Sequence, residues 1–311
     1  MGQLEDMAMF VRIVDAGSIT KAAAQLDMAK SAVSRRLKDL ESHLGAQLIS
    51  RTTRNSHLTE AGEQYYRRAN NILTEVDALN EQTRGAPARI EGTLKMTVPL
   101  SFGLMHLSQV IHEYAHQNPN LSFELDFSDR HIDLIEEGYE LAIRIAELKD
   151  SSYQAKRLTP IRLMLCASPD YLSRMGTPHT LEELQQHEFL QYGLNKHDTL
   201  ELIDGQGQQH TVAINAKIKA TNGEFLMDMA VKGHGITFIP TFIAYQAVAR
   251  GELLPLLTQY QLPTLNAYAV YPKNRFLSQR CRYFIDFIAE YFGEYPYWDQ
   301  VYSDKVSSSL N

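Results

Sequence analysis

The chain has 311 residues, of which 44% are hydrophobic and 22% charged, and its formal net charge is −7. This length exceeds one typical compact core, so two or three domains are expected. No apolar run is long enough to span a membrane, and the first residues carry acids where a signal peptide needs cations. Both cysteines, Cys166 and Cys281, lie in apolar patterns that predict reduced core thiols rather than a redox switch. We therefore expect a cytoplasmic protein.

The charge is concentrated unevenly along the chain. Between Ser18 and Thr59, seven cations stand against three acids, a local balance of +4, whereas the remainder of the chain is strongly acidic. The seven cations are Lys21, Lys30, Arg35, Arg36, Lys38, Arg51 and Arg54. A basic module on an acidic body predicts binding of a polyanion at one end of the molecule only.

The first sixty residues predict a compact run of short helices. Residues 4–16 are amphipathic and can end at Gly17, and Ser18 is a suitable N-cap for the alanine-rich stretch "ITKAAAQL". After the turn "DMA", a helix from Lys30 to about Gly45 aligns its apolar residues on one stripe. The segment "AQLISRTTRNSHLT" then predicts two short strands around a polar tip. This order is typical of a winged helix-turn-helix.

In that motif the second helix enters the major groove of DNA, and the wing follows the phosphates. Short or forked donors on the helix suit base edges and phosphate oxygens, and they are Ser31, Ser34 and Arg35. The cations that can supply sequence-independent attraction are Lys30, Lys38, Arg51 and Arg54. An ordinary solvated helix face would explain any one of these cations but not the whole arrangement.

The same residues carry a family resemblance. The stretch "AAAQLDMAKSAVSRRLKDLESHLGAQLISRTTRNSHLTEAGEQYY" is similar to the N-terminal domain of LysR-type transcriptional regulators, with their "SAVSR" recognition helix and "LTEAG" motif. The resemblance is tight from residue 4 to about residue 66, and the rest of the chain fits in length and organisation. Lys30 stands where many relatives have Gln or Pro, so base preference at that edge does not carry over.

The next segment predicts a helix with a heptad-like seam. From Glu60 to Asn80, apolar residues recur at alternating spacings of four and three, namely Ala61, Tyr65, Ala69, Ile72, Val76 and Leu79. Such a stripe needs a partner, either the rest of the chain or a second copy. The resemblance implies a second copy, so Tyr65, Ile72, Val76 and Leu79 are expected to join a homodimer, and dimers are expected to form a homotetramer. Glycines and a proline in "RGAPARIEG" then mark a hinge.

After Gly92, strand and helix patterns alternate, which predicts α/β layering with parallel pairing. Crossings near residues 160–162 and 265–267 would divide this part into two lobes. The segment "DRHIDLIEEG" is predicted to be a short helix, and "HTVAINAKIKA" to be strand. The resemblance implies an effector domain similar to periplasmic binding proteins, with the inducer held between the lobes.

The fold class is therefore multidomain α/β: a winged helix-turn-helix, a linker helix and a two-lobed effector domain. The expected divisions are 1–59 for the DNA-binding domain and 60–88 for the linker helix. One lobe is expected to comprise 92–161 and 266–298, the other 162–265, and 299–311 to be a disordered tail.

Ligands of open α/β sheets lie outside the carboxyl ends of strands, near helix N-termini. The residues predicted to contact an effector there are Ser101, Phe102, Ser128, Tyr192, Thr221 and Asn222. Ser128 and Asn222 could instead simply cap helices. Helix starts expected at Ser101, Ser128, Ser168 and Asn222 favour an anion, so a small carboxylate is predicted, with Tyr192 and Phe102 covering its apolar part.

A competing motif lies at His112, Glu113 and His116, where "HEYAH" matches the H-E-x-x-H pattern of zinc peptidases. The apolar stripe of that helix would turn both histidines away from the core, so no metal site and no enzyme are predicted. No cofactor is expected either. The rival interpretations are a metal-dependent hydrolase built on these three residues and an architectural DNA-binding protein without an effector.

Overall fold

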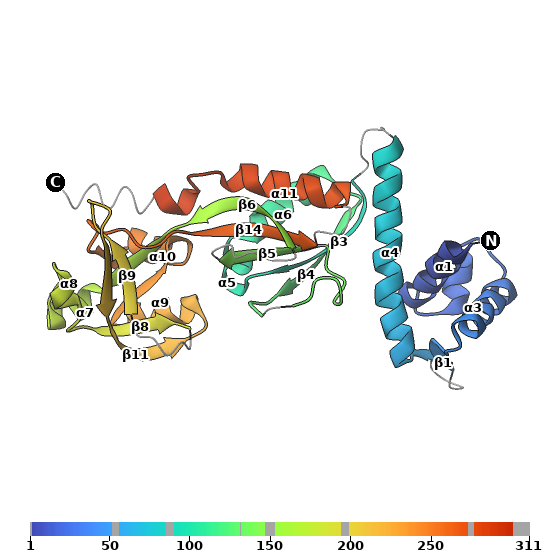
Figure 1. Ribbon diagram of the computed structural model, residues 1–311, viewed down its shortest axis with the longest axis horizontal. Coiled ribbons are helices and arrows are strands. Elements are labelled where there is room, and N and C mark those ends of the chain that lie inside the picture. Colours follow the sequence, from blue (N-terminus) through green and yellow to red (C-terminus); the bar gives the residue numbers. More distant parts are fainter. Residues whose placement is uncertain are drawn as a thin grey trace.

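The computed structural model describes residues 2–51, 56–84, 90–130, 132–146, 153–193, 199–272 and 277–300. Three parts follow one another along its longest axis (Figure 1). An N-terminal helical unit lies at one end, the long helix α4 (Glu60–Arg84) stands beside it, and two α/β lobes make up the rest. Within the described residues, no helix is both long and apolar enough to cross a membrane.

The N-terminal unit has the predicted order of elements. Its helices and strands are α1 (Gln3–Asp15), α2 (Ile19–Gln25), α3 (Lys30–Leu44), β1 (Ile49–Arg51) and β2 (Ser56–Leu58). Ser18 caps α2 by accepting a hydrogen bond from the Lys21 N–H at 3.1 Å. Gly45 ends α3 in the left-handed conformation, with φ of +64°, which glycine adopts without steric cost. Val33 and Leu37 of α3 are fully buried, so the predicted stripe forms the core of this unit.

The first lobe, lobe I, is built on a five-stranded sheet in the order β4-β3-β5-β14-β6. The strands are β3 (Gly92–Val98), β4 (Leu121–Phe127), β5 (Leu141–Ala146), β6 (Tyr153–Ile161) and β14 (Leu265–Pro272). Its helices are α5 (Leu100–Phe102), the π-helix η1 (Gly103–Leu107), α6 (Ser108–Gln117) and α11 (Gln279–Phe292). Helix α11 lies along the long strands β6 and β14 (Figure 1).

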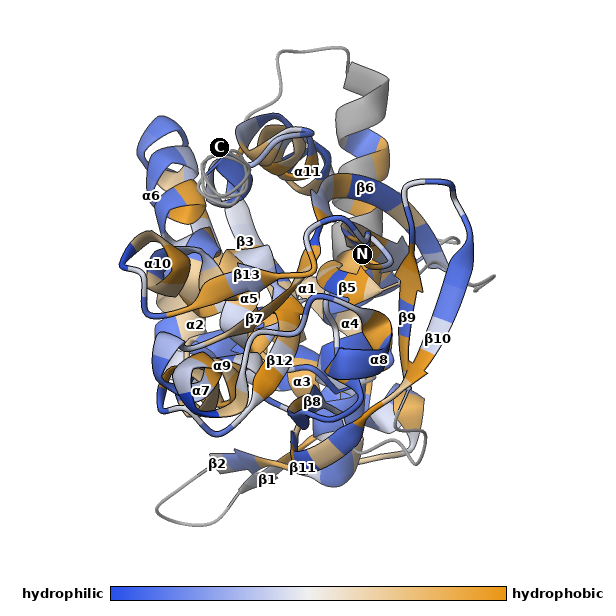
Figure 2. Ribbon diagram, turned by 90° about the vertical axis from the view of Figure 1, so that its left-hand side faces the viewer, coloured by the Kyte–Doolittle hydropathy of each residue, from blue (hydrophilic) through white to orange (hydrophobic). Residues whose placement is uncertain are grey.

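The second lobe, lobe II, has a sheet in the order β11-β8-β12-β7-β13 and a two-stranded ribbon of β9 and β10. Its strands are β7 (Leu163–Ala167), β8 (Glu188–Tyr192), β9 (Thr199–Ile203), β10 (Gln209–Ala213), β11 (Asn215–Ala220), β12 (Ile236–Pro240) and β13 (Leu254–Leu256). Its helices are α7 (Pro169–Met175), α8 (Leu181–Leu184), α9 (Gly223–Val231) and α10 (Thr241–Ala249). Strands β12 and β13 are strongly hydrophobic, whereas β10 is largely hydrophilic (Figure 2).

The sheets are mixed rather than purely parallel, which corrects the predicted pairing. Strand β3 runs parallel to β4 and β5, but β14 is antiparallel to β5 and β6. The chain enters lobe II between β6 and β7 and returns at β14, so the returning strand runs against its neighbours. The single strand predicted over residues 210–220 is two strands in different sheets, because β10 pairs with β9 and β11 with β8.

Two further predictions are wrong. The short helix predicted over residues 129–138 is absent from its described part, in which residues 134–138 form turns and the Asp133 carboxylate accepts hydrogen bonds from the Ile135 and Glu136 N–H groups. The tail is predicted to be disordered over 299–311, yet Asp299 is buried and hydrogen-bonded; residues 301–311 lie outside the described residues. The polar residues at the end of the sequence do not predict the contacts of Asp299, because these contacts depend on residues far away in the chain.

Candidate functional site

The predicted DNA-contacting residues of α3 lie together on its outer face. Lys30, Ser31, Arg35 and Lys38 are exposed and Ser34 is half-buried, opposite the buried stripe that packs against α1 and α2. Among the described residues, none forms an ion pair with Lys30, Arg35 or Lys38. This face therefore presents cations and hydroxyl groups that are free to meet phosphates and base edges.

Arg36, the neighbour of Arg35, has a different role. Its Nε and Nη2 donate to the Asp6 carboxylate at 2.9 and 2.5 Å, and Nη2 also lies 3.8 Å from the Glu5 carboxylate. These contacts join α3 to the first turn of α1. Of the cations on this helix, Arg36 stabilises the fold, and the outer face carries the others.

Two motif residues position the wing. The Glu41 carboxylate accepts hydrogen bonds from the Leu48 and Ile49 N–H groups at 2.9 and 3.1 Å, which fixes the start of β1. A Cβ at Gly62 would lie 2.0 Å from the Leu48 carbonyl oxygen, so only glycine lets α4 approach the wing so closely. Arg51 ends β1, and the structure describes its backbone only; Arg54 lies outside the described residues.

The seam predicted on α4 divides into two halves. The Tyr65 ring packs edge-on against Phe10 of α1 at 5.5 Å, and Ala69 is buried in a cluster with residues of α1. Tyr65 therefore packs against its own chain while staying half-buried, and its predicted dimer contact remains a prediction. Further along, Ile72 is 39% and Leu79 49% exposed, while Val76 is half-buried. The second half thus presents the larger apolar side chains, Ile72 and Leu79, at the surface.

Helix α4 also contacts lobe I. The Asn71 amide donates a hydrogen bond to the Ile135 carbonyl at 3.0 Å, and Asn71 is almost fully buried. On the side of α1, the Tyr66 hydroxyl donates to the Asp15 carboxylate at 2.5 Å. Burial, followed by this hydrogen bond, raises the pKa of Tyr66 to about 12. The helix thus connects the DNA-binding unit with the turns that follow β4.

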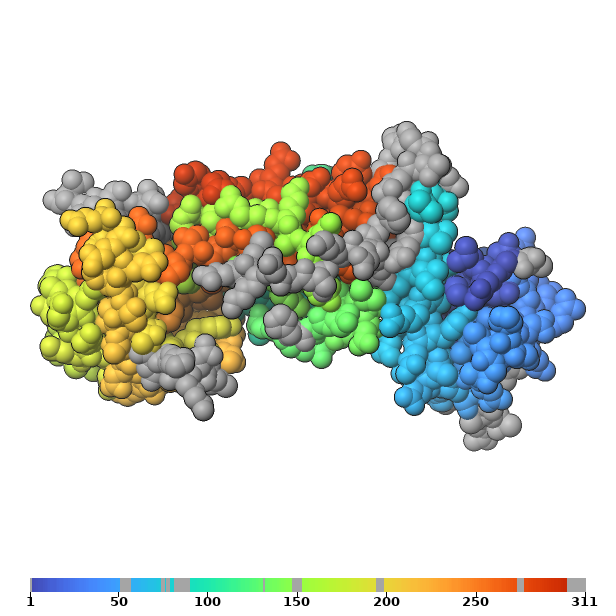
Figure 3. All heavy atoms as spheres, in the orientation of Figure 1, coloured from blue at the N-terminus to red at the C-terminus, as the bar shows by residue number. Residues whose placement is uncertain are grey.

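The two lobes meet where helices α5 and α9 begin. The Ser101 hydroxyl in lobe I donates to the Glu224 carboxylate in lobe II at 3.2 Å. Asn222 caps α9 by accepting a hydrogen bond from the Phe225 N–H at 2.7 Å, and Thr221 beside it is exposed. The surface is indented between the green lobe I and the yellow lobe II on this side (Figure 3). Ser101 therefore lies close to the start of α9, which Thr221 and Asn222 precede, and their shared role in effector binding remains a prediction.

Ser128 and Tyr192 stand at the carboxyl ends of β4 and β8. The Ser128 hydroxyl accepts a hydrogen bond from the Arg130 N–H at 3.3 Å, which closes a turn and does not begin the predicted helix. Tyr192 is 46% exposed, and its partial burial, followed by the charge of Asp129, raises its pKa. Asp129 follows Ser128 in the same turn, so this region contains a carboxylate as well as hydroxyl groups.

Arg144 approaches the same region from β5. Its guanidinium donates to the Ile143 and Arg130 carbonyls at 2.9 and 3.4 Å. Burial lowers its pKa, and the nearby Asp129 and then Asp126 oppose that shift. Arg144 is thus anchored by lobe I carbonyls beside two carboxylates.

Phe102 does not line this region. It is fully buried, and its ring contacts Phe242, Phe292 and Trp298 with centroid distances of 5.4, 5.5 and 6.0 Å. The prediction that Phe102 covers a ligand is therefore wrong, because Trp298, which lies near the end of the described chain, completes a core around it. Helix α5 begins at Leu100, so Ser101 lies within the first turn rather than at the cap.

The H-E-x-x-H motif lies on α6, with His112 and His116 exposed. The Glu113 carboxylate accepts a hydrogen bond from the Gln109 amide at 2.9 Å. Across the described part of the chain, no group of three or more His, Cys, Asp or Glu side chains could hold a metal ion. The two cysteines are buried, and burial raises the pKa of Cys166 to about 12, which suits an unreactive core thiol.

Comparison with known proteins covers nearly the whole chain. The family model of the bacterial regulatory helix-turn-helix protein, lysR family, matches residues 4–63, and that of the LysR substrate binding domain matches residues 87–293. The chain is 35% identical to the HTH-type transcriptional regulator CrgA of Neisseria meningitidis serogroup C, over 93% of this chain and 97% of CrgA. It is 30% identical to the HTH-type transcriptional activator AaeR of Escherichia coli, over 94% and 95% of the two chains.

Solved structures give the same result. The structure of CrgA, a LysR-type transcriptional regulator from Neisseria meningitidis, matches with a TM-score of 0.59 and 36% identity, covering 92% of this chain and 97% of that one. The full-length structure of the Vibrio cholerae virulence activator AphB matches in fold with a TM-score of 0.57 at 24% identity, covering 93% of this chain and 99% of that one.

Proposed function

Because the chain belongs to the LysR family of DNA-binding transcriptional regulators, we propose that a small effector bound between its two lobes changes how it binds or bends operator DNA. The observation that carries this proposal is the contact of Ser101 with Glu224, which brings polar groups of both lobes to one place. A ligand that replaced or joined this contact would bind both lobes at once. Such differential binding is what shifts a conformational equilibrium.

We propose that α3 lies in the major groove, with Ser31, Ser34 and Arg35 at base edges and Lys30 and Lys38 at phosphates. The exposure of this face and the use of Arg36 inside the fold support the assignment. Arg51 and Arg54 of the wing remain predicted phosphate contacts. The family identity sets the hydrolase interpretation aside, and the presence of the effector domain removes the reason for a purely architectural role.

The active form is proposed to be a homodimer that assembles into a tetramer in the cytoplasm. Ile72, Val76 and Leu79 supply the apolar surface of α4, while Tyr65 supports the helix from within the chain. The domain boundaries at residues 59, 88, 161 and 265 likewise remain predictions. Sedimentation of Ile72→Asp tests the assembly: we expect monomers that no longer bind a two-half-site operator. An Ile72→Asp protein that stays dimeric would place the interface elsewhere.

The effector is proposed to be a small carboxylate, held by Ser101, Ser128, Tyr192, Thr221 and Asn222. The Glu224 carboxylate already accepts the Ser101 hydrogen bond, so an internal anion stands where the effector anion is expected. An incoming carboxylate must displace it, and Asp129 adds further repulsion. We therefore expect Glu224→Gln to bind carboxylates more tightly than the parent chain does.

Thermal-shift screening of carboxylates against their neutral and cationic analogues tests this proposal. An effector present at 100 times its dissociation constant should stabilise the protein by about 2.7 kcal/mol. Thr221→Ala should reduce the response, whereas the control Thr211→Ala, exposed on β10, should not. If Glu224→Gln weakens binding, or if only neutral or cationic compounds stabilise the protein, the effector is not an anion.

A further inference from the structure

The segment that follows α11 crosses from lobe I to lobe II. Trp298 is fully buried, and its ring contacts Phe292 at the end of α11 at 5.1 Å. The same ring lies 6.0 Å from Phe102 of lobe I and 6.2 Å from Phe242 of lobe II. A single side chain near the C-terminus thus fills a core to which both lobes contribute.

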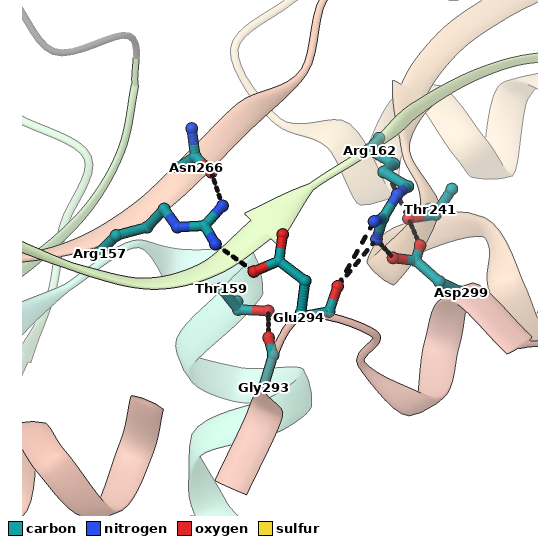
Figure 4. A network of polar contacts seen from close by, with 8 residues as sticks. All are labelled: Arg157, Thr159, Arg162, Thr241, Asn266, Gly293, Glu294 and Asp299. Atoms are coloured by element: carbon teal, nitrogen blue, oxygen red, sulfur yellow. Dashed lines mark hydrogen bonds and ion pairs between the residues drawn. The ribbon is translucent and has the colours of Figure 1, made fainter. Parts of the chain in front are cut away.

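Polar contacts anchor this segment on the lobe I side (Figure 4). The Thr159 hydroxyl of β6 donates to the Gly293 carbonyl at 2.8 Å, and the Glu294 carboxylate pairs with Arg157. Arg162 donates to the Glu294 carbonyl at 3.4 and 3.5 Å. These contacts hold the segment against the strand that leads out of the lobe.

Asp299 then ties the segment to the crossing itself and to lobe II. Its carboxylate pairs with Arg162, the residue between β6 and β7, and accepts the Thr241 hydroxyl at 2.6 Å (Figure 4). Thr241 begins α10, and its N–H donates to the Arg162 carbonyl at 2.9 Å. The crossing, lobe II and the C-terminal segment therefore meet at one buried carboxylate.

His106 makes a third connection from the π-helix η1. Its Nε2 donates to the Phe242 carbonyl at 3.1 Å, because a carbonyl can only accept, so its Nδ1 accepts from the Tyr297 hydroxyl at 2.5 Å. One neutral imidazole thus links lobe I, lobe II and the C-terminal segment. Single π-turns within helices occur frequently at functional positions, and this one sits at the junction.

We propose that residues 293–299 form a strap that fixes the angle between the two lobes. Hinge movements are absorbed by a few residues at element ends, and Arg162 is such a residue. The strap holds Arg162 through Glu294 and Asp299, and it holds each lobe through Trp298 and Tyr297. Its effect on the effector response rests on the function proposed above, but its effect on lobe geometry does not.

Distance measurements between spin labels test the strap in the full chain without DNA or effector. Both native cysteines are fully buried, so labels go to Ser122→Cys on β4 and Glu201→Cys on β9, which are exposed positions in different lobes. We expect Asp299→Asn to broaden the interlobe distance distribution and shift its centre. The matched control is Asp286→Asn, which removes the exposed pair of Lys156 with Asp286 within lobe I and should leave the distribution unchanged.

An unchanged distribution in folded Asp299→Asn would overturn the proposal. If that variant lowers the folded fraction, Tyr297→Phe removes only the hydroxyl bonded to His106, and the same two outcomes apply to it. Because no effector is present, a missing effector response cannot mimic either result. If the distance distribution broadens but the response to carboxylates is unaltered, the strap fixes the angle between the lobes and does not regulate the effector response.

Discussion

An arginine on the outer face of α3 and an arginine at the junction between the lobes differ in exposure and in pairing. Arg35 is exposed and, within the described residues, has no ion-pair partner, whereas Arg162 is paired with a carboxylate that is only 6% exposed. An exposed charge adds little to the stability of the fold and remains available to a ligand. A buried charge needs its partner, because an unpaired buried charge is strongly destabilising. Exposure, and not residue type, therefore distinguishes an arginine that is available to a ligand from one that stabilises the fold.

The largest expected effect is the loss of the buried partner. Arg162→Ala leaves the Asp299 carboxylate without its cation, and breaking such a pair costs roughly 3–5 kcal/mol. Because the Arg162 side chain is 32% exposed, water can partly replace it, and we expect the lower end of that range. Urea unfolding of the effector domain measures it. The exposed pair of Lys232 with Asp228 is the matched control, and Lys232→Ala should cost less than about 1 kcal/mol.

The second effect concerns pH at the same junction. Burial lowers the pKa of His106 from 6.5 to about 4, so the folded protein holds the neutral ring that bonds Tyr297 and Phe242. The unfolded chain binds the proton more readily than the folded chain does. The stabilisation by the neutral His106 ring is therefore complete above pH 6.5 and is lost as the pH falls toward 4. A loss on the order of 3 kcal/mol follows from the linkage relation.

Unfolding of the parent and of His106→Gln, measured from pH 7 to pH 4, tests this dependence. The variant should be less stable at pH 7 but should lose less stability on acidification. His234→Gln, at an exposed position, should follow the parent throughout. A parent and a His106→Gln protein with parallel pH profiles would show that His106 is not the group that titrates.

How far the sequence predicts these two regions depends on the range of the contacts. Caps and periodicity act over a few residues, so Ser18, Gly45 and the stripe through Leu37 were predicted and confirmed. The difference between Arg35 and Arg36 depends on Asp6, which is 30 residues away. No local sequence pattern predicts a contact between residues so far apart in the chain.

The junction was missed for the same reason. Trp298 lies directly before the polar tail, and its environment includes Phe102 and Phe242, which are far away in the sequence. Phe102 is predicted to line the cleft because it lies next to Ser101 after a strand, and the sequence does not indicate that Phe292 and Trp298 bury it. Glu224, by contrast, lies two residues after the predicted Asn222 cap, so the acid in "TNGE" was a usable signal.

The third prediction separates two neighbouring arginines. Arg35→Ala should lower affinity for the specific operator by about 1–3 kcal/mol with unchanged stability, because it removes a base contact from an exposed side chain. Arg36→Ala should instead lower the free energy of unfolding by about 1.5–3 kcal/mol, since it removes charged hydrogen bonds to Asp6. Gel-shift titration and urea unfolding of both variants check the pair of results. Equal losses of operator affinity in the two folded variants would contradict the assignment.

The smallest expected effect belongs to Lys38, whose ammonium group lies on the exposed face of α3. A phosphate contact carries no sequence information, so Lys38→Ala should weaken binding to operator and unrelated DNA alike. Each phosphate neutralised by a cation contributes about one unit to the slope of the logarithm of affinity against the logarithm of salt concentration. We therefore expect the slope to flatten by about one unit, with stability within about 0.5 kcal/mol of the parent. Fluorescence anisotropy titrations at several salt concentrations measure the slope on both DNAs.

Lys217, which pairs with Glu188 on lobe II far from α3, supplies the control, and Lys217→Ala should leave both slopes unchanged. If Lys38→Ala changes affinity for the operator only, Lys38 reads bases, and the division of α3 into base-contacting and phosphate-contacting residues must be redrawn.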